Sequence, residues 1–217
     1  MLWMVASIGF AVLAARELMG GARRVDGGFY WPYFLLVCGL ALACAWPPLS
    51  TWRFERFLSS RAIVLADGKH ADVHCNTLFD TMLSSEQLAA GYASFDTGEI
   101  RLQKPWCARL RRYLRNPDAA GGETLWALGL FTHEVMHVRG ERNEALTECQ
   151  AVQRNYRAAR LLGVPDATAR KNARDYYELL YKARVQVGGM QADYYSTACA
   201  PGGAMDEKLA DSSWAQS

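Results

Sequence analysis

One short stretch of the sequence, HEVMH at residues 133–137, has residue types and spacing that suit metal chemistry. Two histidines four residues apart lie on the same face of a helix, close enough for both imidazoles to bind one ion. Zinc accepts neutral imidazole and, in catalytic sites, commonly keeps one coordination position for water. Glu134 would reach that water, take its proton and later pass it to a leaving amine. We therefore predict His133 and His137 as zinc ligands and Glu134 as general base and then general acid.

The surroundings of this stretch favour a site over a chance match. The chain has only four histidines, and two of them lie here. The stretch is embedded in apolar sequence, and charged side chains are rarely buried without a partner or a metal. The other two histidines, His70 and His74, are predicted on a strand, where side chains four residues apart lie roughly 13 Å from each other, too far to share an ion.

A third ligand is available shortly after the second histidine. HExxH followed by NExxxE, at residues 143–148, resembles the zincin metallopeptidases of the gluzincin type, in which a glutamate on a following helix completes the zinc site. The resemblance implies that Glu144 is the third ligand and that Glu148, one turn later, supports a histidine ligand. The reverse assignment, with Glu148 as the ligand, stays open. The glycine turn at Gly140 also fits the metzincin pattern, but the ligand position of that pattern holds Asn143, a poor zinc ligand.

The resemblance covers roughly residues 124–152 and implies two further parts of the site. The strand GEIRLQ, residues 98–103, would be a sheet edge that holds an extended peptide substrate. Tyr194 and Tyr195 are candidates for the donor that stabilises a developing oxyanion. Packing is the alternative role for both tyrosines.

The elements that must position these residues follow from the hydrophobic pattern. Residues 61–75 predict two strands joined by a turn at Asp67-Gly68, and residues 91–103 predict a second hairpin. An irregular tail should follow the last of four helices, which are predicted over residues 105–115, 123–139, 141–162 and 166–185. The predicted fold class is α+β, with a small antiparallel sheet followed by a mainly helical zincin-like catalytic core and two apolar helices at the N-terminus.

The first 49 residues are predicted to anchor the chain in a membrane, with residues 50–217 as the metallopeptidase domain. Residues 1–15 are uncharged but reach only about 22 Å as a helix, whereas residues 29–46 are long enough to cross and carry aromatic residues at both ends. Arginines between the two stretches favour a cytoplasmic loop and an exported domain, but arginines after the second stretch favour the reverse. A start at Met19 would instead make the second stretch an export signal.

The cysteines indicate the cellular compartment, and the net charge bears on the kind of partner. Four widely spaced cysteines without a CxxC pair favour two disulfides over four free thiols. Of the three possible pairings we favour Cys75–Cys107 with Cys149–Cys199. Disulfides in turn favour an extracytoplasmic catalytic domain. The net charge of +2 gives no reason to expect a nucleic-acid partner.

Taken together, the residues and the resemblance predict a membrane-anchored, Zn²⁺-dependent metallopeptidase that hydrolyses peptide bonds in a peptide or protein substrate. The alternative is a non-catalytic zinc-binding membrane protein that uses a zincin-like domain for sensing or partner binding. A chance motif in a helical membrane domain is the third interpretation. The enzyme is favoured because a purely structural zinc site has no need of Glu134 and prefers four protein ligands.

Overall fold

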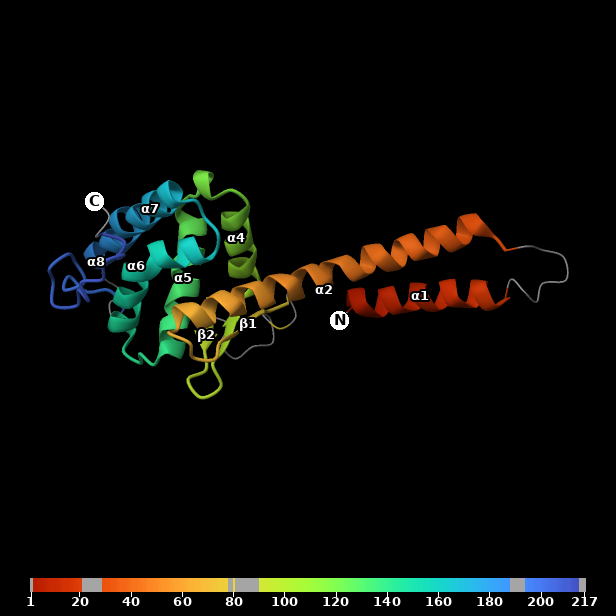
Figure 1. Cartoon of the computed structure of the whole chain (residues 1–217), viewed down its shortest axis with the longest axis horizontal. Helices are drawn as coiled ribbons and strands as arrows, with labels where there is room; N and C mark the ends of the chain where they lie inside the picture. Colours follow the sequence, from red (N-terminus) through yellow and green to blue (C-terminus); the bar gives the residue numbers. More distant parts are fainter. Residues whose placement is uncertain (1, 21–28, 78–79, 81–89, 188–193, 215–217) are drawn as a thin grey trace. The chain divides into compact units, whose positions relative to one another are not determined.

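The computed structural model describes residues 2–20, 29–77, 80, 90–187 and 194–214. Within these residues the protein has the predicted α+β class, with a majority of helix and one small sheet (Figure 1). The chain divides into two compact units, Met1–Phe54 and Glu55–Ser217.

The first unit holds α1 (Leu2–Gly20) and the first part of α2 (Trp31–Leu65), both long and apolar enough to cross a membrane. With 19 residues, α1 is longer than the uncharged run at its start and reaches about 28 Å. Hydrogen bonds link α1 to α2 and to the residue before it: the Ser7 hydroxyl donates to the Ala41 carbonyl at 2.9 Å, and the Tyr30 backbone N–H donates to Glu17 at 3.3 Å.

The second apolar helix is longer than the sequence pattern indicates. Pro47 and Pro48 mark the end of the predicted span, but α2 continues through both and ends at Leu65. The predicted strand over residues 61–65 is therefore wrong. Its β-branched residues favour a strand locally, but the buried side chains here are Leu58, Ala62 and Leu65, whose spacing is helical. The turn at Asp67-Gly68, with both residues at positive φ, ends this helix instead of joining two strands.

The sheet contains β1 (Asp72–Cys75), β2 (Gly91–Ala93) and β3 (Glu99–Leu102) in the order β1-β3-β2. The hairpin predicted over residues 91–103 is confirmed, because β2 and β3 pair antiparallel. The purely antiparallel sheet is wrong: with residues 61–65 in α2, β1 has no hairpin partner and pairs parallel to β3. The strand within GEIRLQ, β3, is consequently central and not a sheet edge, and the edge strands are β1 and β2.

The helical part of the second unit is built around α5 (Gly122–Arg139), which contacts α4 (Lys104–Arg115), α6 (Glu144–Leu161) and the sheet (Figure 1). The short 3₁₀ helix η2 (Pro117–Ala119) connects α4 to α5. The predicted helix over residues 166–185 is divided into α7 (Asp166–Asp175), the π-helical segment η3 (Tyr176–Tyr181) and α8 (Lys182–Val187).

The connection between α5 and α6 is a tight turn. Gly140 ends α5 in the left-handed conformation, at φ 116°, which glycine adopts without a steric penalty. The side chain of Asn143 then caps α6 by accepting a hydrogen bond from the Leu146 N–H at 2.9 Å. α6 therefore begins three residues later than predicted, since residues 141–143 are used for the turn.

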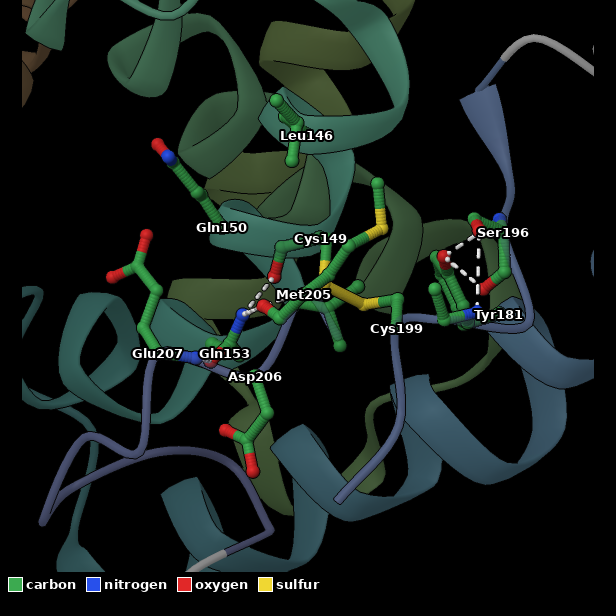
Figure 2. Close-up of a disulfide and its surroundings, with 12 residues drawn as sticks. Leu146, Cys149, Gln150, Gln153, Tyr181, Ser196, Cys199, Met205, Asp206 and Glu207 are labelled. Atoms are coloured by element: carbon green, nitrogen blue, oxygen red, sulfur yellow. Dashed lines mark hydrogen bonds between the residues drawn. A yellow bond between two sulfur atoms is a disulfide. The ribbon is translucent and has the colours of Figure 1, made fainter. Parts of the chain in front are cut away.

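Both predicted disulfides are confirmed. Cys75 is joined to Cys107 between β1 and α4, and Cys149 is joined to Cys199 between α6 and the C-terminal tail. The tail is irregular over residues 194–214 apart from isolated turns, as predicted. It packs along α6, and Figure 2 shows the second disulfide with the tail beside Gln153.

Candidate metal centre

Consecutive elements bring three donor atoms to one point. α5 presents His133 and His137 one turn apart, and the first residue of α6 is Glu144. The two imidazole Nε2 atoms lie 3.1 Å apart. Oε2 of Glu144 lies 3.2 Å from Nε2 of His133 and 3.4 Å from Nε2 of His137. The tight turn at Gly140 places the start of α6 back against α5, which is why ligands so close in sequence converge.

The donor set and its spacing fit a zinc ion. Two ligands at about 2.0–2.1 Å from a tetrahedral zinc lie about 3.3 Å apart, and all three observed separations are close to this value. Oε2 of Glu144 is buried yet has no partner with hydrogen-bonding geometry. A buried carboxylate oxygen without a hydrogen bond is costly, so its position between two imidazoles is well explained by a shared cation.

Hydrogen bonds behind the imidazoles orient both rings. Nδ1 of His133 lies 2.9 Å from Oε2 of Glu148, and Nδ1 of His137 lies 2.9 Å from the carbonyl oxygen of Glu141. A carbonyl oxygen only accepts, so Nδ1 of His137 must donate, and Nδ1 of His133 donates in the same way to the carboxylate oxygen of Glu148. In the neutral imidazoles, the Nε2 lone pairs then point toward each other and toward Glu144. Glu148 therefore lies in the supporting position, and Glu144 in the ligand position.

The charges of the cluster are strongly coupled. Burial disfavours a charge on His133, but contact with Glu144 and Glu148 raises the pKa of its imidazole to about 10. Burial also acts against the charge of Glu144, and the two imidazoles more than offset this, lowering the pKa of its carboxyl to about 2. Without a metal, the His133 imidazole therefore carries a proton that a metal ion would displace.

Glu134 lies beside the cluster and is buried, with only 4% of its surface exposed. Burial raises the pKa of its carboxyl above the ordinary value, and the neighbouring imidazoles oppose this rise. Its Oε1 lies against β2: a Cβ atom placed on Gly91 would be 3.2 Å from it. The absence of a side chain at position 91 leaves room for the carboxylate at the mouth of the cluster.

A cavity of about 710 Å³ opens over these groups. Residues of α5 and α6 contribute one part of its lining, the helical wall, and β2 with the tail residue Tyr194 contributes a second wall. Aromatic side chains also line the cavity: Trp106 of α4 and Trp126 of α5 lie 6.2 Å apart between ring centroids, and Phe95 packs edge-on against His137 at 5.4 Å. The cavity thus combines the charged cluster with aromatic groups.

The C-terminal tail supplies two more cavity residues. Tyr194 stacks on His133 with 5.8 Å between ring centroids, and Tyr195 packs edge-on against Tyr181 at 5.4 Å. Downstream of both tyrosines, the Cys149–Cys199 disulfide fixes the tail to α6 (Figure 2).

Side-chain hydrogen bonds hold the tail along its length. Tyr181 bonds both the N–H and the carbonyl of Ser196, each at 3.1 Å (Figure 2). Gln153 donates to the Met205 carbonyl at 3.0 Å, and Arg157 binds Asp211 through two nitrogens at 2.6 and 2.7 Å. These bonds hold the described part of the tail, which contributes Tyr194 and Tyr195 to the cavity, against α6 and η3.

The predicted residues fall into two groups. The structure brings His133, Glu134, His137, Glu144 and Glu148 into one cluster and places Tyr194 and Tyr195 in the same cavity. The remaining histidines stand apart: His74 contacts Asp72 at 3.2 Å on β1, and the backbone of His70 lies against Gly98. Asn143, which the metzincin pattern would place on the metal, is a helix cap.

Sequence reasoning missed several residues that contact the cluster or its supports. Gly91 lies against Glu134, and Tyr176 donates a hydrogen bond to Glu148 at 2.8 Å. Gly129, inside α5, leaves the space that the Tyr176 ring fills. A glycine in the interior of a strongly apolar helix was the one available signal, because such a glycine usually has a packing reason.

Comparison with known proteins identified no similar protein. No family model matches the chain, and no match was found among curated proteins or solved structures.

Proposed function

We propose that the protein is a membrane-anchored, zinc-dependent metallopeptidase. The observation that carries this proposal is the set of three donor atoms separated by 3.1, 3.2 and 3.4 Å, with a buried carboxylate oxygen that has no hydrogen bond. His133, His137 and Glu144 would hold the ion. Zinc, when bound, supplies a Lewis-acid centre beside which water is deprotonated near neutral pH.

The chain's own residues would carry the proton and hold the substrate. Glu134 takes a proton from the attacking water and delivers it to the leaving amine, and a carboxyl pKa raised by burial suits both steps. An extended peptide would add to the outer edge of β2, since residues 90–93 line the cavity beside Glu134. Tyr194, stacked on His133, is the better placed of the two tyrosines to stabilise the developing oxyanion.

The apolar N-terminal helices and the disulfides support the location. Two helices long enough to cross a membrane precede the site, and two disulfides suit an oxidising compartment. We place the catalytic unit outside the cytoplasm, where it would act on peptides or proteins near the membrane. Reporter fusions after residue 60 test this orientation directly.

The test uses the full chain purified in detergent, with metal analysis and a quenched-fluorescence peptide library. We expect bound zinc, peptide cleavage, and loss of cleavage without loss of zinc in Glu134→Gln. A matched control is Glu178→Gln, which removes an exposed carboxylate paired with Lys182 on the surface. Zinc without cleavage of any peptide would favour the alternative, a non-catalytic zinc-binding membrane protein. Absence of zinc would contradict both.

A further inference from the structure

A buried tyrosine stands behind the metal cluster and takes no part in the proposed reaction. Tyr176 is the first residue of the π-helical segment η3 and is 4% exposed. Its hydroxyl donates to Oε1 of Glu148 at 2.8 Å, while the other carboxylate oxygen, Oε2, holds Nδ1 of His133 at 2.9 Å. Three side chains from η3, α6 and α5 thus form one line that ends on the imidazole.

The Tyr176 hydroxyl keeps its proton and acts as a hydrogen-bond donor. Burial and the neighbouring Glu148 carboxylate hold the pKa of Tyr176 well above its ordinary value, so the phenol stays protonated. Glu148 is itself buried, and a buried carboxylate needs donors to both oxygens. Tyr176 satisfies Oε1, which leaves Oε2 free to face His133.

The helix α5 has a glycine, Gly129, where the Tyr176 ring packs against it. A Cβ atom on Gly129 would lie 2.4 Å from Cε2 and 2.6 Å from the hydroxyl oxygen of Tyr176. Glycine is a poor helix former, and at this position any larger residue would displace the ring. The π-helical segment is the second local irregularity, and such segments occur frequently at functional sites. Gly129 makes room for the Tyr176 ring, and the π-helical segment begins at Tyr176 itself.

We infer that Tyr176 is a positioning residue of the metal centre, which fixes the Glu148 carboxylate so that His133 presents Nε2 to the ion. This inference rests on the proposed zinc site. It adds a residue that contacts neither the ion nor a ligand directly, but holds the side chain that supports a ligand. Without the hydroxyl, Oε1 loses its buried donor and the carboxylate turns away from the imidazole. The consequence is weaker metal binding with an unchanged substrate cavity.

The test is a double-mutant cycle on zinc affinity, measured with the full chain in detergent against a chromophoric chelator. Tyr176→Phe should weaken zinc binding by about threefold to tenfold, at or below the lower end of the range for residues that support a ligand directly. In the Glu148→Ala background the same substitution should cause no further loss, because its partner is gone. Tyr177→Phe is the control, since that hydroxyl contacts the Cys199 carbonyl at 3.4 Å and not the cluster.

A second readout separates positioning from general damage. In Tyr176→Phe, saturating zinc should restore peptide turnover to the wild-type value, with an unchanged KM. Unaltered zinc affinity in Tyr176→Phe, or an equal loss with and without Glu148, would overturn the inference while leaving the proposed function intact. Failure of the wild-type protein to bind zinc would overturn the proposed function and this inference with it.

Discussion

The two walls of the cavity are assembled in different ways. The helical wall contains the three donors, Glu134 and Glu148, all between residues 133 and 148 on α5 and α6. The second wall combines the edge strand β2 with Tyr194 of the tail, which come from far before and far after that stretch. If zinc is held as proposed, metal affinity should depend on the first wall alone, whereas catalysis should depend on both.

The largest effect should come from removing the ligand oxygen on the helical wall. Glu144→Ala leaves two imidazoles and should abolish zinc binding at micromolar protein, because the third donor is lost. Glu148→Ala should weaken binding by about 10–100-fold only, since it removes a support and not a ligand. Chelator competition on both variants measures the difference, and a greater loss in Glu148→Ala would exchange the two roles.

On the second wall, the hydroxyl of Tyr194 should affect turnover and leave metal binding unchanged. Tyr194→Phe is expected to lower kcat by about 10²–10³-fold if the hydroxyl stabilises the oxyanion, with zinc content unchanged. Tyr195→Phe is the matched variant, because its ring lines the same cavity but packs on Tyr181. Steady-state kinetics of the two variants decides between them, and a larger loss in Tyr195→Phe would move the donor role to that residue.

The helical wall should also show a pH dependence of zinc affinity. In the metal-free protein, contact with two carboxylates raises the pKa of His133 to about 10, so the imidazole is protonated at neutral pH. Zinc must displace that proton, and affinity should therefore rise with pH, about tenfold per unit for each proton released. Glu144 adds nothing to this slope, since its carboxyl pKa of about 2 keeps it ionised. A zinc affinity that is constant between pH 6 and 8 would contradict the proton assignment.

The smallest effect should follow a methyl group added to β2. In Gly91→Ala the new Cβ would lie 3.1 Å from the Arg101 carbonyl oxygen and 3.2 Å from Oε1 of Glu134. A shift of Glu134 by a few tenths of an ångström should lower kcat about threefold to tenfold and leave zinc affinity unchanged. Gly122→Ala, whose nearest neighbour is 3.8 Å away, is the control. Equal effects of the two substitutions would show that β2 does not constrain Glu134.

The contrast between the walls also explains what the sequence could predict. The ligand cluster depends on helical spacing and on one glycine turn. Both are local features, so the sequence of residues 133–148 was enough to predict the cluster. The number of separated cysteines indicated two disulfides, and the pairing favoured among the three possible ones is the one that the structure contains. β1 was assigned the wrong partner because residues 61–65 favour a strand locally, while burial of Leu58, Ala62 and Leu65 keeps them in α2.

Long-range contacts account for the rest. The hydrogen bond from Tyr176 to Glu148 spans 28 residues, and the approach of Gly91 to Glu134 depends on the register of β2 against β3. Neither has a periodic signature in the sequence. The π-helical turn at Tyr176–Tyr181 likewise lies within a pattern that reads as continuous α-helix.

The most direct test of the central claim is the zinc content of the purified full chain after dialysis against metal-free buffer, measured by mass spectrometry beside a His133→Ala/His137→Ala variant. The proposed site predicts one zinc per wild-type chain and none in the variant. A wild-type chain without zinc, or a variant that retains it, would contradict the assignment of His133, His137 and Glu144 as a metal centre.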